Sequence, residues 1–469
     1  MSDGAEGSAA KQQQVEEAWR WSPPPGSDAS LKLTDVYTDE EVTLERSWST
    51  ITFLVQPITA TKAAPSVRLL RTLISADTTR RVLQSSFGFN VLFALCVDDL
   101  GVDAETARAF EEELVKALKA ANILPPSLML RASDYIEEAK TTMDTLLKNA
   151  HAYEADGEIM LGSDTNPALW VKGSGDAQTF DASWGKGRPT ATGIAMALTA
   201  GALDAPLDIV FGGEGTANVS SVEALNAALK SASAVTAAPV ISTPVCLQAK
   251  ATTMDADAVG VGNDDATTVA EAATSPRLRL AVLRQSVFDD VALNAEALKD
   301  ITHIEQQITA FLAAMSEQTS VYTQDRFEVL TQHDQDLMLN FFQLRQEIHK
   351  SLCNNINTAA VLDHLLAIIA TVAAYTTAQA AATKPLHVAS LRQIGLFVTG
   401  LLVRLGVSFD MHAATIGFAV AAVATPEEIA ARRKEFSQVF AKFFEQLSSG
   451  PDADAYKSII DQARAEGIF

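Results

Sequence analysis

The chain has 469 residues, of which 48% are apolar, which is enough for a large core in two or three domains. Its 58 acidic residues outnumber 36 basic ones, giving a net charge of −22. DNA binding and binding to anionic membranes both rest on clustered Lys and Arg side chains. The charge balance therefore argues against a DNA-binding protein and against a membrane-surface protein.

The termini and the cysteines indicate the compartment. Residues 1–30 are polar and close with Pro23-Pro24-Pro25-Gly26, so we expect a tail without a secretory or mitochondrial leader. Cys96, Cys246 and Cys353 lie far apart and form no CxxC pattern, which predicts neither a zinc ribbon nor a disulfide framework. An intracellular, cytoplasmic location fits these features, and the assembly hypothesis given below adds the cytoskeleton or cilium as candidates.

The first elements along the chain predict a βαβ unit. A strand is expected over Ile51–Thr59 and a helix over roughly Ser66–Ser85. Asn90–Val97 is a continuous apolar run, which is typical of a buried parallel strand. Helices are predicted over Glu105–Asn122 and Arg131–Ala150, separated by Pro125-Pro126.

Predicted strands and helices also alternate in the middle of the chain. Ala205–Phe211 and Pro239–Ala249 are strand-like, Val222–Ser233 is helical, and residues 251–275 are predicted to be an exposed loop. From Pro276 to about Gly406 almost every residue is predicted to be helical, and Glu427–Leu447 adds one more helix before a break at Ser448–Pro451. The fold class is therefore α/β with a parallel sheet, followed by an all-α helical bundle.

Thr358–Thr383 is the most apolar run of the chain. Asp363 and His364 interrupt it and alanine dominates its second half, so we expect a bundle helix and not a membrane span.

Several segments, taken in their order, carry a resemblance to a known family. They are RTLISADTTRRVLQSSFGFNVLFALCVDDL (Arg71–Leu100), WGKGRP (Trp184–Pro189), PLDIVFGG (Pro206–Gly213), SPRLRLAVLRQ (Ser275–Gln285) and IHKSLCNNINTAAVLDHLLAII (Ile348–Ile369). Together they resemble the cysteinyl-tRNA synthetases, a family of class I aminoacyl-tRNA synthetases, over roughly residues 30–445.

The resemblance implies a division of the chain. After the tail at residues 1–30, residues 31–275 are expected to form a Rossmann-like (HUP-type) synthetase domain with a helical connecting insertion at about 101–165. Residues 276–445 are expected to form a helical, anticodon-binding-like domain, and residues 446–469 a C-terminal tail or helix.

The family's zinc site would fall on residues that cannot bind zinc. The two zinc cysteines correspond to Val55 and Ala195, and the His-His-x-x-Glu cluster corresponds to Ser220, Ser221 and Ala224. Zinc requires Cys, His or carboxylate ligands. The resemblance therefore implies a site without its metal.

The two ATP-binding motifs also depart from the family. The HIGH-type motif would be Ser66-Val67-Arg68-Leu69, without His or Gly, and the KMSKS-type loop would fall near Asp255–Val259, with two carboxylates where the family has cations. Lys250 is the only lysine between 231 and 297, so no displaced loop replaces it. We expect no catalytic, cofactor-binding or metal-binding residues of the family's kind.

Other motifs have a functional and a structural interpretation. WGKGRP, with Lys186 and Arg188, could bind an anion or be a tight packing turn, and Phe211–Thr216 resembles a phosphate loop only loosely. The basic run Ala431–Lys434 and the acidic segment Asp255–Asp265 are expected to be solvated surface. Cys353 and Cys96 are expected in the core, and His349, His364 and His387 at surface or capping positions.

These expectations favour a pseudoenzyme that serves as a structural or protein-interaction subunit of a larger assembly, with cytoskeletal, ciliary or ribosome-associated particles as candidates. The alternative is a tRNA-binding regulator without aminoacylation activity. A third interpretation, an enzyme with a new site on the old fold, has no nucleophile–base pair or metal spacing to support it.

Overall fold

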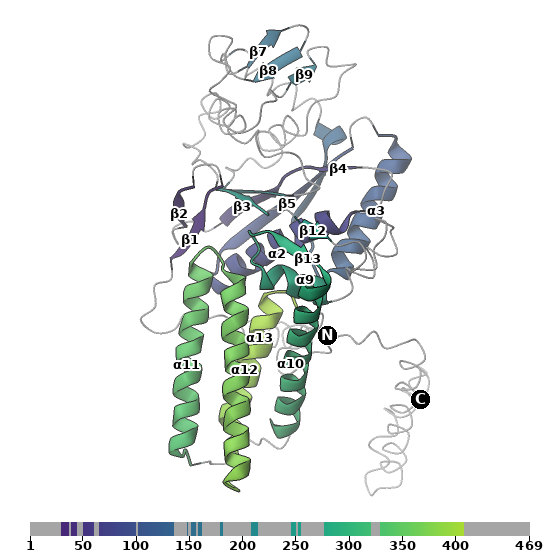
Figure 1. Cartoon of the computed structure of the whole chain (residues 1–469). Coiled ribbons are helices and arrows are strands. Elements are labelled where there is room, and N and C mark those ends of the chain that lie inside the picture. The colour runs from purple at the N-terminus through teal and green to yellow at the C-terminus, as the bar shows by residue number, and fades with distance from the viewer. Residues whose placement is uncertain are drawn as a thin grey trace, which may run out of the picture. The chain divides into compact units, whose positions relative to one another are not determined.

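A parallel sheet of six strands forms the α/β part of the chain (Figure 1). The computed structural model describes residues 30–36, 39–44, 50–60, 65–99, 102–135, 148, 152–155, 158–161, 179–181, 208–213, 245–249, 252–254, 276–319 and 329–407. All of these fall within the first of two compact units, Met1–Phe418.

The strand order in this sheet is β11-β10-β3-β5-β4, and β6 also pairs with β5. Every pairing is parallel, as the continuous apolar runs predicted. The strands are β3 (Thr50–Val55), β4 (Ile58–Thr59), β5 (Asn90–Asp98), β6 (Leu128–Arg131), β10 (Ile209–Gly212) and β11 (Val245–Gln248).

The predicted βαβ unit is confirmed. Helix α2 (Val67–Ser86) connects the β3–β4 strands to β5, and β3 pairs in parallel with β5 from Thr50↔Asn90 to Leu54↔Ala94. Of its 20 residues, 17 are buried, so α2 is a central helix covered on nearly all sides. Its polar side chains must therefore find partners inside the protein.

Helix α3 (Ala104–Ala120) confirms the helix predicted after β5. Asp103 caps it by accepting a hydrogen bond from Thr106 N at 2.9 Å, and Phe110 and Leu114 lie on its buried face. The helix predicted to start at Arg131 is wrong at its beginning. Leu128–Arg131 is strand β6, paired with β5, and a 3₁₀ turn, η1 (Ala132–Tyr135), follows it.

Pairing with β5 explains why Leu128–Arg131 is a strand. Leu128, Met129 and Leu130 form a short apolar run, whose period cannot separate strand from helix. Beside the exposed edge of β5 the run gains backbone hydrogen bonds and buries Leu130 against Cys96. Most of residues 136–150 lie outside the described residues.

Smaller strands accompany the main sheet. β12 and β13 pair in parallel, so residues 252–254 are a strand within the segment predicted to be an exposed loop, and residues 291–293 interrupt the predicted helical region. A three-residue strand has no sequence period to reveal it. The small strands are β1 (Leu31–Thr34), β2 (Glu41–Leu44), β7 (Ala152–Ala155), β8 (Glu158–Leu161), β9 (Thr179–Asp181), β12 (Thr252–Met254) and β13 (Val291–Leu293).

The second half of the described chain is helical, as predicted from Pro276 to Gly406. Figure 1 shows α10 to α13 as a bundle of long helices, with α11 at its edge beside α12. The helices are α9 (Pro276–Arg284), α10 (Ala295–Thr319), α11 (Gln332–Cys353), α12 (Thr358–Ala381) and α13 (Val388–Arg404).

Among the described helices, α12 alone is long and apolar enough to cross a bilayer, and 39% of its most apolar window is buried. It packs on α11, α9 and α10 and buries Leu365, Ile368 and Val372. In this structure it serves as the bundle helix that the sequence predicted.

Aromatic side chains form the centre of the sheet's core. Phe53 on β3 lies with its ring centroid 5.1 Å from Phe93 on β5 and 5.9 Å from Phe211 on β10. Phe211 in turn contacts Phe288, which lies between α9 and β13, at 6.2 Å. The same hydrophobic cluster continues into the helical bundle, so one core serves both parts.

Candidate functional site

The carboxyl ends of β3 and β10 mark the place where an open parallel sheet binds ligands. β3 ends at Val55, which pairs with Phe211 of β10. The backbone N–H of Gln56 donates to Phe211 O at 2.8 Å and extends this pairing by one residue. Val55 itself is fully buried. Its side chain fills the core at this edge and offers no metal ligand.

The start of α2 is the second part of this edge. Ser66 caps the helix, since its Oγ accepts a hydrogen bond from Leu69 N at 3.2 Å. Val67 and Leu69 are buried in the core and Arg68 is exposed. Ser66, Val67 and Leu69 of this segment thus serve capping and packing.

Gly213, directly after β10, has a structural explanation. A Cβ atom at this position would lie 2.6 Å from Oγ1 and 2.7 Å from Cγ2 of Thr72 on α2. A side chain at position 213 would therefore require Thr72 to shift. The remaining residues of the loose phosphate-loop match, 214–216, lie outside the described residues.

Several predicted sites also lie outside the described residues. They are Trp184–Pro189 with Lys186 and Arg188, Ala195, Ser220, Ser221, Ala224, Lys250, Asp255–Asp265 and Ala431–Lys434. Among the residues that the structure does describe, no group of three or more His, Cys, Asp or Glu side chains is placed to hold a metal ion.

The histidine predictions have different outcomes. His387 is a capping residue, as predicted: it is the N-cap of α13 and its Nδ1 accepts a hydrogen bond from Ser390 N at 3.2 Å. His364 is half-buried on α12. His349 contradicts the prediction, because it is 1% exposed and its ring lies 6.3 Å from that of Phe87. Packing of α11 against the α/β part turns this position inward.

The cysteine predictions are largely confirmed. Cys96 on β5 is fully buried, and burial raises the pKa of its thiol well above the usual range, with Asp98 and Asp99 adding to the effect. Cys353 packs on the core but is half-buried and lies 3.5 Å from His349 Nε2. Cys246 is a residue of β11, and nothing further is described of its side chain.

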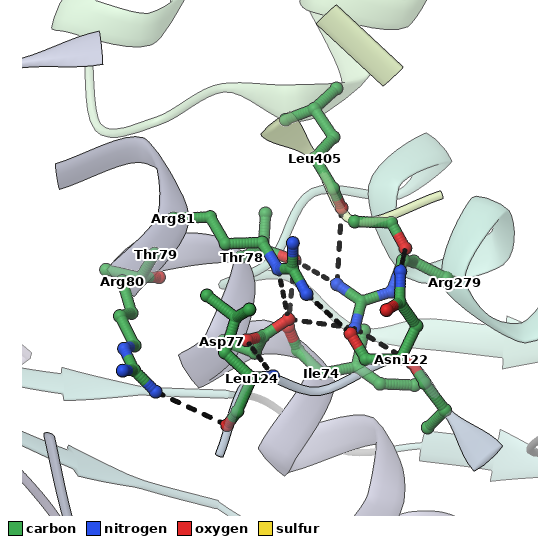
Figure 2. Close-up of polar contacts among 12 residues, drawn as sticks. Ile74, Asp77, Thr78, Thr79, Arg80, Arg81, Asn122, Leu124, Arg279 and Leu405 are labelled. Atoms are coloured by element: carbon green, nitrogen blue, oxygen red, sulfur yellow. Dashed lines mark hydrogen bonds and ion pairs between the residues drawn. The ribbon is translucent and has the colours of Figure 1, made fainter. Parts of the chain in front are cut away.

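A buried ion-pair cluster that sequence reasoning missed lies between α2 and α9 (Figure 2). Asp77 is fully buried, and its Oδ2 accepts hydrogen bonds from Arg81 Nε at 2.8 Å and from Arg279 Nη2 at 2.9 Å. Its Oδ1 accepts from Leu124 N at 3.0 Å. One carboxylate therefore serves two guanidinium groups and a backbone amide.

Backbone carbonyl groups at two helix ends also accept hydrogen bonds from the buried arginines. Arg279 donates to Ala121 O at 3.0 Å and to Leu405 O at 3.2 Å, and Arg81 donates to Asn122 O at 2.6 Å. These oxygens belong to the C-terminal ends of α3 and α13. Because a helix carries partial negative charge at its C-terminus, both ends stabilise the buried cations.

Both helices end in a left-handed residue that makes this approach possible. Asn122 follows α3 with φ 53°, and Gly406 follows α13 with φ 77°. Gly406 N donates to Val403 O at 2.9 Å and Val407 N donates to Leu402 O at 3.0 Å, which is the Schellman arrangement. Asn122 Nδ2 donates to Gly406 O at 2.9 Å and joins the two ends.

A signal for this cluster exists in the sequence, although it is weak. Asp77 and Arg81 have the i, i+4 spacing of an ion pair within a helix. Such a pair is normally solvated, and the third member, Arg279, is 202 residues away from Asp77.

Comparisons with known proteins show which family the chain resembles. Residues 61–168 match the model of the tRNA synthetases class I (C) catalytic domain. The cytoplasmic cysteine–tRNA ligase of Homo sapiens is 21% identical over 401 residues, which cover 74% of this chain and 52% of the relative. The cysteine–tRNA ligase of Encephalitozoon cuniculi is 22% identical over 345 residues, covering 64% and 70%. The chain is therefore similar to the cysteinyl-tRNA synthetases. It spans about half the length of the human relative.

Solved structures of class I synthetases share the fold of this cysteinyl-tRNA synthetase-like chain. Methionyl-tRNA synthetase of Mycobacterium tuberculosis, bound to methionyl-adenylate, superposes with a TM-score of 0.54 at 14% identity, covering 76% of this chain and 92% of that one. The leucyl-tRNA synthetase of Agrobacterium radiobacter K84 gives a TM-score of 0.55 at 9% identity, covering 89% and 91%. The predicted fold class, a Rossmann-like domain with a parallel sheet followed by a helical domain, is thereby confirmed.

The segment matched to the family model carries part of the buried ion-pair cluster. Residues 61–168 include α2, β5 and α3, and with them Asp77, Arg81 and Asn122. In this synthetase-like chain, the matched segment contributes three members of the contact between the sheet and the helical bundle.

Proposed function

We propose that the chain is a cysteinyl-tRNA synthetase-like pseudoenzyme that serves as a structural or protein-interaction subunit of a larger assembly. One observation carries the proposal. At the end of β3 and the start of α2, the residues that correspond to the zinc cysteine and to three of the four HIGH positions are Val55, Ser66, Val67 and Leu69, which pack or cap.

The chemistry of these side chains supports the loss of activity. Val55 has no atom that can bind a thiolate-coordinating metal. At the HIGH positions, activation of an amino acid requires donors that stabilise charge building on the ATP phosphates. Val67 and Leu69 have no polar side-chain atom, and the Ser66 hydroxyl is engaged with Leu69 N.

Retention of the folded body supports the second half of the proposal. The sheet and the helices α9 to α13 share one core, and at their contact Arg279 donates to Asp77, Ala121 and Leu405. A well-packed body in which the described residues Val55, Ser66, Val67 and Leu69 pack or cap is suited to present surfaces to other proteins. Cytoplasmic, cytoskeletal, ciliary and ribosome-associated particles are the candidate assemblies.

An exchange assay tests the enzymatic half. We expect no cysteine-dependent exchange of pyrophosphate into ATP by the purified chain, with an active cysteinyl-tRNA synthetase as positive control under the same conditions. Exchange above the background of a cysteine-free reaction would refute the pseudoenzyme assignment.

The alternative is a tRNA-binding regulator without aminoacylation activity. The observation in its favour is the retained helical part, α9 to α13, in the place of the family's anticodon-binding domain. The net charge of −22 counts against it, because phosphate binding needs basic surface.

A tagged pull-down from native cells, washed at moderate and at high salt, separates the two functions. Stoichiometric proteins that survive high salt without RNA support a structural subunit, because packed apolar interfaces resist salt. Enrichment of tRNA that washes off as salt rises supports the regulator instead, because phosphate contacts weaken steeply with salt.

A further inference from the structure

The outer face of α11 carries exposed apolar side chains. Leu339 is 58% exposed and Phe342 is 43% exposed. At about 100° per residue, Leu339 lies on the side of the helix opposite to Leu337, Phe341 and Ile348, which are buried in the bundle. A large apolar residue directed away from the core of its own chain is informative, because that face is normally polar.

The spacing of this face is that of a helix-pairing seam. Gln332, Gln335, Leu339, Phe342 and Gln346 are all exposed and follow one another at intervals of three, four, three and four residues. This 3-4 alternation places them in one narrow stripe and is the repeat by which two helices pack side by side. We call these five residues the α11 seam.

Phe342 contacts an aromatic side chain of its own helix. Its ring centroid lies 5.5 Å from that of Phe341, which is buried and packs edge-on against Phe397 of α13 at 5.3 Å. An aromatic side chain with few rotatable bonds loses little conformational entropy on binding, and aromatic residues are common among those that dominate interfaces.

The seam is also free of charge in a strongly acidic chain. The exposed residues between positions 337 and 346 are Leu339, Asn340, Phe342, Gln343 and Gln346. Of the charges that flank them, Asp336 accepts a hydrogen bond from Gln332 and Glu347 pairs with Lys350 at 2.6 Å. A partner selected for its basic charge would find no carboxylate along this stretch.

A second copy of the chain fits this face better than a different partner does. In a two-fold contact each residue meets the same surface of the other copy, so a charged seam would repel itself. Two antiparallel copies of α11 that cross between positions 340 and 341 place Leu339 of each copy against Phe342 of the other. The same crossing places Gln335 of each copy against Gln346 of the other, and amide groups both donate and accept.

We propose that the chain self-associates through an isologous, antiparallel contact between two copies of the α11 seam. The inference goes beyond the proposed function and does not depend on it, because an active or an inactive chain could form the same contact. One helix face is smaller than a standard interface of about 1,600 Å². The dimer is therefore expected to be weak and to depend on concentration.

Sedimentation velocity of the full chain over a wide concentration series tests the proposal. The native chain should shift from monomer to dimer as concentration rises, and Leu339→Glu with Phe342→Glu should weaken the dimer about tenfold or more. The matched control is Val115→Glu, at a position 36% exposed on α3, which should dimerise as the native chain does. All variants change exposed residues, and equal thermal unfolding midpoints would verify that they fold.

A charge-swapped variant tests the antiparallel register. Leu339→Lys combined with Phe342→Glu places a positive side chain at position 339 opposite a negative one at position 342 of the other copy. This variant should dimerise more tightly than the variant that carries glutamate at both positions.

Three outcomes would overturn the proposal. The first is a native chain that remains monomeric at every concentration, including one that instead captures a different protein or RNA through α11. The second is a double-glutamate variant that dimerises like the native chain. The third is a charge-swapped variant that dimerises no more tightly than the double-glutamate variant.

Discussion

Asp77 and Arg279 lie 202 residues apart in the chain and form a fully buried ion pair, with Oδ2 and Nη2 separated by 2.9 Å. Burial lowers the pKa of Arg279 to about 10, while the Asp77 carboxylate acts in the opposite direction. The pair joins α2, a helix of the α/β part, to α9, the first helix of the helical part. Because Asp77 also accepts a hydrogen bond from Arg81, a substitution of Asp77 tests the whole cluster.

We expect Asp77→Asn to be strongly destabilising. The change leaves Arg81 and Arg279 buried without their shared carboxylate, and removal of one partner of a buried pair costs about 3–5 kcal/mol. Urea unfolding followed by circular dichroism measures the loss. The control is Glu113→Gln, which breaks the exposed pair with Lys116 and should cost far less, because water screens an exposed pair. A loss no larger for Asp77→Asn than for the control would contradict the assigned role.

Gly406→Ala tests the close approach of α13 to Arg279. A Cβ atom would lie 2.4 Å from Arg279 Nη1, and φ of 77° is unfavourable for any side chain. Gly88 provides a matched control, because its φ is 76° and nothing lies within 4 Å of its Cβ position.

Both substitutions carry the backbone strain of about 1–2 kcal/mol, and only Gly406→Ala adds the clash. The expected result is a greater loss of unfolding free energy for Gly406→Ala than for Gly88→Ala. Equal losses would show that strain alone accounts for the glycine.

Gly213→Ala should be destabilising because its Cβ would meet Thr72 on α2, at an expected cost of about 1–3 kcal/mol. Thr72→Ala removes the two atoms in question, so the double variant should lose less than the sum of the single losses. Thermal unfolding of the four chains gives the coupling energy. Additive losses would mean that the strand end and the helix separate to admit the methyl group.

The N-terminus of α11 predicts a dependence of stability on pH. Asp334 Oδ1 accepts a hydrogen bond from Tyr375 at 2.6 Å, and its Oδ2 accepts one from Thr331 N at 2.7 Å. Burial raises the pKa of Asp334, but the hydrogen bonds from Tyr375 and Thr331 outweigh it and the net pKa is lowered. Since the pKa is lower in the folded than in the unfolded state, the carboxylate stabilises the protein above the unfolded value of about 3.9. This stabilisation is lost as pH falls through the folded pKa.

Tyr375→Phe should therefore cost about 1.5–3 kcal/mol near neutral pH, and less as Asp334 becomes protonated. Urea unfolding at several pH values from neutral to acid measures the difference between the native and variant chains. Tyr135→Phe, on η1, is a control that should show no such trend. A difference that stays constant down to acid pH would contradict the role of the Asp334 carboxylate.

The predictable parts of the fold are those with a sequence period or a long apolar run. Asn90–Val97 could be identified as a buried strand and Ser66 as the start of a helix because both signals are local. Strand β6 could not, since Leu128–Arg131 is too short for a period and depends on the edge of β5. The prediction of a surface position for His349 was wrong for a related reason, because its burial depends on how α11 packs against Phe87.

For the candidate site, the sequence could show only which residues stand at the positions of the family's motifs. Val55 and Ser66–Leu69 could be placed by resemblance, but their packing and capping roles required the structure. Arg279 could not be identified at all, because an arginine on a helix is normally exposed and its partners come from α2, α3 and α13.

The buried ion-pair cluster has a consequence for how the chain is inherited. Asp77, Arg81 and Asn122 lie in the stretch that matches the class I synthetase catalytic-domain model, and their contacts with one another and with Arg279 are internal. Selection for a folded chain alone is enough to keep these side chains, whatever becomes of the residues around Val55 and Ser66. A chain of this fold can therefore stay recognisable as similar to the synthetases whether or not it charges tRNA.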